Sequence, residues 1–376
     1  TVVAEQPGAN CTTGGQAIEI GYDKDRDGTL EQSEISHTTY VCNPANKIVH
    51  DGDLTISGQA DAYLLIGVQR IRGTLYIDAP TVTSLDTSAL VQVDNGIQVN
   101  VFGGSSMSFP ALTVSKVFDS EFSKFSLSLP VLQQVDKLVA TAPSFSADSL
   151  TSVANSMILT GVQTDITLPA LQQAAYLDVE SDGSLHMFSA PQAASIGDLW
   201  MYGMNGSFPS LSTTNDIWLQ AGADSFSAPA ITSQYWIELD DTAFTALPVD
   251  PANVYQYYLG NNPSLTVSSS QSSLDTLDVY GAVTLDFPSL TTVQSLSFEE
   301  TALTQISMPT ITSVGTLQIQ DNTALTQLSF PALTSVADAY IQRNAMLPTC
   351  EATAITSMAT DDEAHDGNDD NATCPI

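Results

Sequence analysis

The chain repeats one short sequence pattern about every 20 residues. Between residues 54 and 347 a bulky apolar residue, a proline, a small or β-branched residue and an aliphatic residue follow one another, as in Phe109–Leu112 and Phe330–Leu333, with degenerate copies between the clear ones. Successive prolines or their equivalents lie 18 to 22 residues apart, as Pro110 and Pro130 do. So short and regular a period predicts a solenoid, in which each repeat stacks on the previous one.

Apolar residues occupy fixed places within each repeat. After Pro309 they stand two, five, eight and ten places on, at Ile311, Val314, Leu317 and Ile319. The last two alternate as in a strand with one face turned to a core, and the proline marks a corner after the preceding strand. We therefore predict an all-β fold of short strands whose stacked turns pair in parallel.

Three asparagines stand three residues after the second strand position, at Asn262, Asn322 and Asn344, where leucine-rich repeats use asparagine to bond a turn backbone. The segments Gly52–Ile56 and Val314–Ile319, together with the similar segment at 73–77, resemble the receptor L domain. That family is a right-handed parallel β-helix related to leucine-rich repeats, found in growth-factor receptor ectodomains, fungal cell-wall proteins and bacterial surface proteins. The resemblance implies this fold and extracellular recognition or wall organisation, and it brings no catalytic residues.

Charge excludes one class of partner. The chain has 42 acidic and 9 basic residues, a formal net charge of -33. Nucleic-acid binders need clustered lysine and arginine, so this class is excluded, and an anionic membrane surface is disfavoured for the same reason. With 43% apolar and only 14% charged residues, the chain should fold around a core. No apolar run is long enough for a transmembrane segment, so none is predicted.

The four cysteines form two pairs, each bracketing a short polar segment at one end of the chain. Cys11 with Cys42 and Cys350 with Cys374 predict two terminal disulfides and an oxidising, extracellular or cell-surface location. Zinc is the alternative, but its usual close ligand spacings do not occur. We expect an N-terminal cap at 1–46, a β-solenoid at 47–347 and a disulfide-closed acidic C-terminal cap at 348–376.

The segment from Asp23 to Glu34 matches the twelve-residue EF-hand calcium loop at each diagnostic position, with Gly28 at the sharp turn. The expected ligands are Asp23, Asp25, Asp27, the Thr29 carbonyl, Glu31 and Glu34. An acidic surface loop is the alternative. Because the preceding segment is a poor helix, we predict a structural Ca²⁺ site rather than a sensor EF-hand. The Cys-bounded unit resembles a module at the head of bacterial surface proteins, which implies a bacterial envelope.

All three tryptophans fall on one expected outer face. Alternation turns Leu199 and Met201 inward, so Trp200 points outward, and Trp218 and Trp236 do so in the next two turns. The other candidate ligand-binding residues on this face are Tyr202, Tyr258, Asp198, Asp216 and Glu238. Rings beside carboxylates suit a glycan or a protein ligand. The alternative is cross-strand packing that merely covers the sheet.

Catalytic motifs are absent from the sequence. The four histidines are scattered, and no nucleophile elbow, phosphate loop or dinucleotide fingerprint occurs. We therefore predict a non-catalytic recognition or adhesion module, with a structural cell-wall or envelope scaffold as the second reading. A polysaccharide-active enzyme using an acid pair such as Glu299 with Glu300 is third, and ice binding is a remote fourth. The sequence does not set the ligand or the oligomeric state.

Overall fold

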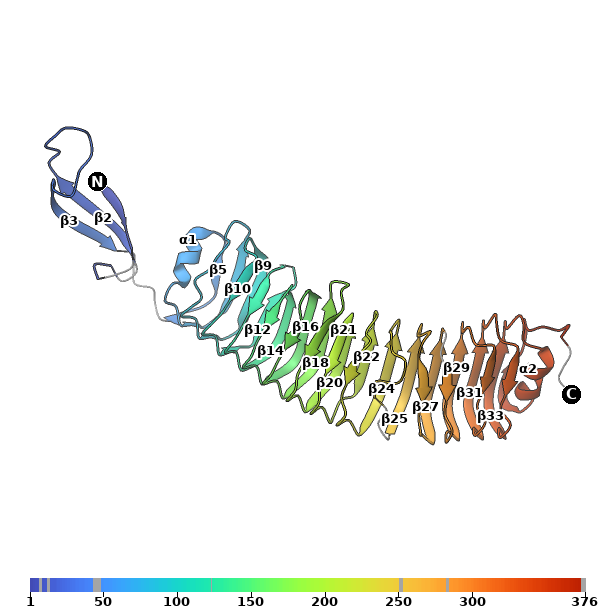
Figure 1. The fold of residues 1–376 in the computed structure, drawn as a ribbon. Coiled ribbons are helices and arrows are strands. Elements are labelled where there is room, and N and C mark those ends of the chain that lie inside the picture. The colour runs from blue at the N-terminus through green and yellow to red at the C-terminus, as the bar shows by residue number, and fades with distance from the viewer. Residues whose placement is uncertain are drawn as a thin grey trace.

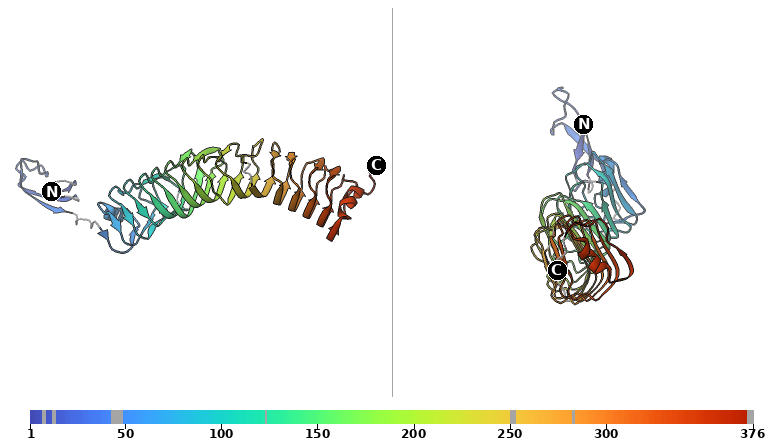
Figure 2. Two further views of the ribbon diagram at one scale, coloured as in Figure 1. Left: turned by 90° about the horizontal axis from the view of Figure 1, so that it is seen from below. Right: turned by 90° about the vertical axis from the view of Figure 1, so that its right-hand side faces the viewer.

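The computed structural model describes residues 1–6, 9–11, 14–42, 49–122, 124–249, 253–281 and 284–372. It is an all-β protein in which about 15 turns form a parallel β-solenoid, as the repeat predicts. The stack is elongated and gently curved, and Figure 2 shows it from below and along its axis. Figure 1 follows the chain from the N-terminal strands to the last turns.

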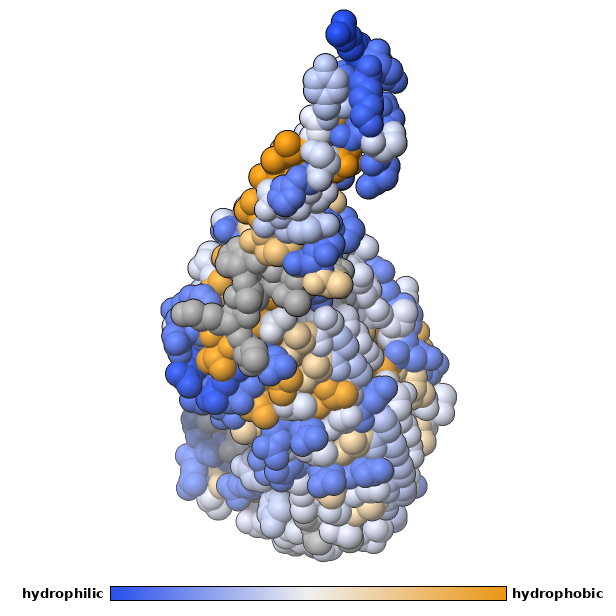
Figure 3. Space-filling view, turned by 90° about the vertical axis from the view of Figure 1, so that its left-hand side faces the viewer, coloured by the Kyte–Doolittle hydropathy of each residue, from blue (hydrophilic) through white to orange (hydrophobic). Residues whose placement is uncertain are grey.

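The N-terminal unit is a three-stranded antiparallel sheet. Its strands are β1 (Val2–Glu5), β2 (Gly15–Gly21) and β3 (Ile35–Cys42), in the order β1-β2-β3. Cys11 and Cys42 are joined by a disulfide, which confirms this predicted pair. The sheet has almost no core of its own, since Ala17 is its only strand residue that is buried, and several valines and an isoleucine are exposed. Figure 3 shows hydrophilic residues at one end of this unit and hydrophobic ones toward the other.

The solenoid is organised by one 20-stranded sheet whose neighbouring strands are parallel (Figure 1). In chain order its strands are β4 (Val49–His50), β5 (Leu54–Ile56), β6 (Arg70–Ile71), β7 (Thr74–Ala79), β8 (Gln92–Val93), β9 (Gly96–Phe102), β11 (Val114–Ser115), β12 (Val117–Ser120), β14 (Gln134–Thr141), β16 (Ser152–Val162), β18 (Gln173–Ser181), β20 (Ser195–Tyr202), β22 (Asp216–Gln220), β24 (Ser233–Asp240), β25 (Asn253–Gly260), β27 (Ser273–Tyr280), β29 (Thr292–Glu299), β31 (Ser313–Gln320), β33 (Ser335–Gln342) and β34 (Ala359–Ala364).

Shorter strands form small parallel sheets beside this one. They are β10 (Ser106–Ser108), β13 (Ser126–Ser128), β15 (Phe145–Ser146), β17 (Ile166–Thr167), β19 (His186–Ser189), β21 (Met204–Ser207), β23 (Phe226–Ser227), β26 (Thr266–Ser268), β28 (Thr284–Asp286), β30 (Gln305–Ser307) and β32 (Gln327–Ser329). The helices are α1 (Gln59–Ala62), the 3-10 turn η1 (Tyr63–Leu65) and α2 (Thr349–Thr356).

The repeated proline pattern is the corner after a short strand, as predicted. Phe109 and Pro110 follow β10 directly, and Met308 and Pro309 follow β30. Proline suits this place because it has no N–H to contribute to a sheet. The bulky residue before it turns inward, and Phe109 is fully buried. The same two-residue pattern therefore ends the short strand and places a bulky side chain in the core.

The core is one continuous column of apolar side chains. The residues at the four predicted places after Pro309 are all buried, with Leu317 and Ile319 at 0% exposure. Equivalent residues of successive turns stack on one another, and the rings of Phe188 and Phe208 lie 5.8 Å apart between centroids. Each turn thus buries its apolar face only against the next, as a solenoid requires.

A ladder of buried asparagines ties neighbouring turns together. The Asn322 side-chain amide donates to the carbonyls of Phe298 and Gln320, each at 2.9 Å, and its oxygen accepts from the Thr301 N–H at 2.8 Å. Asn344 is equally buried and its amide donates to the Ile319 carbonyl at 2.9 Å. The predicted backbone-bonding role of these asparagines is confirmed.

A second corner has a backbone conformation that the sequence did not reveal. From β20 to β33, the residue directly after each long strand has a positive φ, for example 57° at Ala221 and 49° at Glu300. Gly203 and Gly281 take the same place after β20 and β27. L-residues rarely adopt this left-handed conformation, and the residue types found here are too varied to form a motif.

The stack continues past residue 347. Strand β34 pairs in parallel with β33, and α2 contacts both strands. The predicted disulfide of Cys350 stays a prediction, because Cys374 lies outside the described residues. The expected boundary at 46/47 also falls in a stretch that the structure does not describe. Within the described ranges, no helix has the length and apolar character needed to cross a membrane.

Candidate functional site

The parallel register arranges the outward residues of the central turns in columns. The middle column runs from strand to strand through Asp178, Trp200, Trp218, Glu238, Tyr258 and Asp278. A neighbouring column contains Tyr176, Asp198, Asp216 and Trp236. We call these ten residues, with Tyr202, the aromatic–acidic face. In the later turns of the same sheet these columns hold small or polar residues such as Thr276, Ser295 and Ser297.

Two of the three tryptophans form a contacting pair. The ring centroids of Trp200 and Trp218 are 4.3 Å apart at an interplanar angle of 36°, and Tyr176 lies 6.3 Å from Trp200. Trp200 remains 37% exposed, so solvent reaches the pair. Trp236 points outward as expected but stands in the neighbouring column, opposite Asp216. Tyr202 is exposed and lies opposite Gln220.

The carboxylates of this face are half-buried between the rings. Burial raises the pKa of Asp178 to about 6, with Glu180 adding repulsion, while the Tyr176 hydroxyl donates to its Oδ2 at 3.2 Å. Burial likewise raises the pKa of Glu238, whose Oε1 accepts from the Gln220 amide at 3.0 Å. Such side chains are exposed enough to meet a ligand, yet they lack full hydration.

Three further acids complete the arrangement. Burial raises the pKa of Asp216, and its Oδ1 is buried without a protein hydrogen-bond partner. Asp198, directly opposite Asp216, adds to the shift by repulsion. Burial also raises the pKa of Asp278, with Glu299 as the second cause. The face therefore concentrates negative charge in a setting that hydrates it poorly.

Basic residues are missing from this part of the chain. Residues 138–342 contain 19 acids and no lysine or arginine. Lysine and arginine pair with acids outside this stretch or at its end, as with Lys137 and Asp119 at 3.1 Å and Arg343 and Asp321 at 2.7 Å. No lysine or arginine side chain from these turns can therefore neutralise the aromatic–acidic face.

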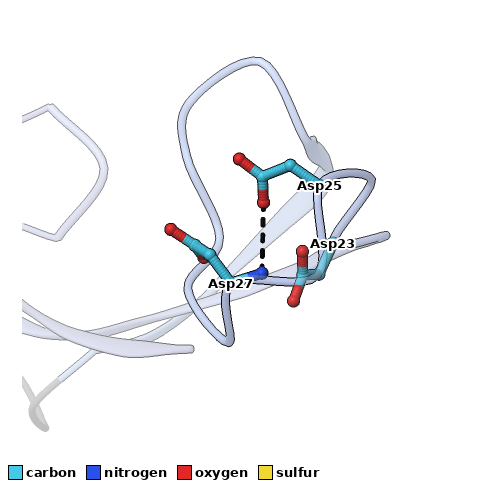
Figure 4. A group of neighbouring side chains, drawn as sticks. All are labelled: Asp23, Asp25 and Asp27. Carbon is cyan, nitrogen blue, oxygen red and sulfur yellow. Dashed lines mark hydrogen bonds between the residues drawn. The ribbon is translucent and has the colours of Figure 1, made fainter.

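The predicted calcium loop joins β2 to β3 and gathers its acids. Carboxylate oxygens of Asp23, Asp25 and Asp27 all lie within 4.8 Å of one another, and those of Asp25, Glu31 and Glu34 do so as well. Figure 4 shows the three aspartates close together on this loop, with the Asp27 N–H donating to Asp25. Gly28 has a φ of 90°, in keeping with its predicted place at the sharp turn.

Internal hydrogen bonds shape this loop. The Thr29 hydroxyl donates to Asp27 at 2.6 Å and lowers the pKa of that carboxyl. Glu34 is only 7% exposed and accepts from the Lys24 N–H at 2.7 Å. The shared hydrogen bond between the two glutamates raises the pKa of Glu31 and lowers that of Glu34. The set of oxygen donors and its crowding of like charges fit a hard cation such as Ca²⁺.

Comparison with known proteins matches the N-terminal unit alone. Residues 1–42 match a family model described as Domain of unknown function (DUF7151). No curated protein and no solved structure matches the chain. The matched range ends at Cys42 and so contains the disulfide-bounded sheet together with the acidic loop.

Part of the aromatic–acidic face was not in the set of residues predicted from the sequence. Asp278 was missing because it follows two turns after the last tryptophan. Tyr176 and Asp178, one turn before the tryptophans, were expected to point outward but were not among the candidate ligand-binding residues, and in the structure they contact or adjoin Trp200. The repeat could have identified Asp278, Tyr176 and Asp178 as members of the face, since all three occupy outward positions of the same strand pattern.

Proposed function

We propose that the protein is an extracellular recognition or adhesion module that binds its ligand on the aromatic–acidic face. One observation carries the proposal: the exposed Trp200–Trp218 pair stands among half-buried carboxylates, whereas later turns place small polar residues there. A scaffold needs only the inward residues. Large rings on an outer face are typical of ligand sites and interfaces.

The chemistry of the face suits a glycan or a protein ligand. Indole rings pack against the CH groups of a sugar or against apolar and cationic side chains. The carboxylates of Asp178 and Glu238 accept hydrogen bonds from hydroxyl or amino groups. Because they are partly desolvated, hydrogen bonds that a ligand donates to them are stronger than those made to fully hydrated acids.

The proposed location is the cell surface, within a bacterial envelope. The Cys11–Cys42 disulfide is compatible with an extracellular protein. The resemblance of the Cys-bounded unit to modules of bacterial surface proteins supports the envelope.

A structural Ca²⁺ ion is proposed for the loop from Asp23 to Glu34. The three-stranded sheet buries too few side chains to form a core, and small units of this kind depend on disulfides or metals for stability. The buried Glu34 and the three aspartates would hold the ion, which would offset their mutual repulsion.

The test of the binding face uses a glycan array and a panel of extracellular matrix and surface proteins, probed with the full chain. We expect Trp200→Ala with Trp218→Ala to weaken binding by about 30-fold or more, since a central aromatic contact contributes about 2 kcal/mol or more. The matched control is Tyr235→Ala with Tyr255→Ala, an exposed ring pair at 5.9 Å outside the face.

Two results would contradict the proposal. If the tryptophan variant binds as well as the parent, the face is not the site. If no ligand binds, while the protein self-associates or is retained in an envelope fraction, the structural scaffold becomes the better account.

A further inference from the structure

The central turns carry negative charge that the chain itself does not neutralise. Among the 19 acids of residues 138–342, those of the aromatic–acidic face stand on a broad outer sheet with no lysine or arginine in the same stretch. His186 begins the short strand β19, which is not part of the 20-stranded sheet, and its side chain lies beside Asp165. A partner that meets this face must therefore supply any positive charge.

The middle column places acids next to aromatic rings, and this arrangement suits a cation. Asp178 stands next to Trp200, and Glu238 stands between Trp218 and Tyr258. The faces of aromatic rings attract cations, and a guanidinium both stacks on indole and pairs with a carboxylate. A neutral sugar would need donors as well as acceptors, and on this face the Tyr176 hydroxyl and the Gln220 amide already donate to Asp178 and Glu238.

The length of the middle column equals that of a short extended peptide. Five strand steps separate Asp178 from Asp278, which amounts to about 24 Å at about 4.8 Å per step. An extended segment of about seven residues spans that distance at about 3.3 Å per residue. Charges that recur along such a segment would meet Asp178, Glu238 and Asp278 in turn.

We propose that the partner of the aromatic–acidic face is a protein segment rich in arginine and lysine, bound in extended form along the column from Asp178 to Asp278. This inference rests on the proposed binding function and narrows its ligand to one class. Bound cations would also offset the cost of half-burying these carboxylates, so affinity should fall as pH drops below about 6, where Asp178 becomes protonated.

The experiment titrates the full chain with a ten-residue peptide of alternating arginine and serine, followed by tryptophan fluorescence and calorimetry. The matched probe replaces each arginine by citrulline, which keeps the shape and removes the charge. We expect the arginine peptide to bind at least about tenfold more tightly than the citrulline peptide, and to weaken between 50 and 300 mM NaCl as screening increases.

Two triple variants locate the site. The face variant carries Asp178→Asn, Glu238→Gln and Asp278→Asn. The control variant carries Asp148→Asn, Asp165→Asn and Asp286→Asn, three exposed acids outside the aromatic–acidic face. We expect the face variant to bind the arginine peptide at least about tenfold more weakly, and the control to lose less than about threefold, because distant surface charges are screened. Circular dichroism and thermal melting establish that each variant is folded.

Each other outcome overturns the inference in a distinct way. Equal losses of affinity in the face and control variants would mean that the peptide is attracted nonspecifically to the net charge. Equal affinity for the citrulline and arginine peptides would mean that binding does not depend on the positive charge of the peptide. If a neutral glycan binds in a Trp200-dependent and Trp218-dependent manner but the arginine peptide does not bind, the proposed function stands and the cationic partner is wrong. If no ligand depends on the tryptophans, both fail.

Discussion

At the scale of single residues, the outward acids are the least expected feature. Alternation along a strand predicted which side chains point outward, because its period of two is exact enough to carry from turn to turn. It did not predict how deeply those side chains are buried. That depth depends on the ring across the strand pair, such as Trp200 beside Asp178, and therefore on the register between turns.

Replacing Asp178 by Asn should stabilise the protein at neutral pH. The folded pKa of about 6 lies above the ordinary value, so folding favours the protonated acid, and stability is lost as pH rises from about 4 to 6. Its neighbours Tyr176, Glu180, Asp198 and Trp200 bring no positive charge. We expect the free energy of unfolding to rise by about 1 kcal/mol at pH 7.5, a value reduced for solvent screening, and by almost nothing at pH 4.

Urea denaturation at the two pH values measures this difference. The control is Asp148→Asn, which removes an exposed acid outside the face. A gain for Asp178→Asn that is equal at both pH values would rule out ionisation as its cause.

At the scale of elements, the corners between strands decide how turns connect. The proline corner was predictable because one residue type recurs there. The left-handed corner was not, because Ala221, Glu300 and Arg343 share a backbone conformation and no side-chain property. The asparagine ladder lies between these cases: Asn322 and Asn344 were visible at fixed spacing. The ladder continues to Asn368, which donates to the Ile341 carbonyl. Asn368 was not predicted because its sequence distance from Asn344 is longer than the distance between Asn322 and Asn344.

Removing one rung of this ladder should be costly. Asn322→Ala removes the donor to the Phe298 carbonyl and the acceptor of the Thr301 N–H, while the Gln320 carbonyl keeps the Glu300 N–H. Because a buried unsatisfied polar group costs about 1–3 kcal/mol, we expect a loss of about 3 kcal/mol in the free energy of unfolding. Denaturant titration checks it, with the exposed Asn155→Ala, expected within about 0.5 kcal/mol of the parent, as control. A loss below about 1 kcal/mol would mean that these backbone groups find other partners.

The acidic loop makes the second prediction at this scale. If Ca²⁺ holds the loop, chelator should lower the melting temperature of the N-terminal sheet, and Glu34→Gln should reproduce that loss even in calcium. At a free calcium concentration a hundredfold above the dissociation constant, binding contributes about 2.7 kcal/mol. Calorimetry of the full chain with and without chelator follows the transition.

Glu19→Gln, a strand residue outside the loop, is the control and should keep its response to calcium. Identical melting of the N-terminal sheet in calcium and in chelator would leave the acids as a solvated surface loop.

At the scale of the whole molecule, the repeat period alone was enough to predict the architecture. A 20-residue period with fixed apolar places leaves few alternatives to stacked parallel turns, because no single repeat can bury its apolar face alone. Function was not accessible in the same way. The inward apolar residues recur from turn to turn, so their pattern predicts the fold. The outward rings and acids occur in only a few turns, so no repeated pattern links them to a function.

The parallel stacking has a mechanical consequence. Hydrogen bonds between turns run along the long axis of the solenoid. A pulling force on the two ends therefore acts on every interface between turns in series. The weakest turn yields first, and its 20 or so residues can extend to roughly 70 Å from the about 4.8 Å that they occupied in the stack. Under tension the molecule would lengthen stepwise, as a force-absorbing tether, while the turns still closed continue to present their outer face.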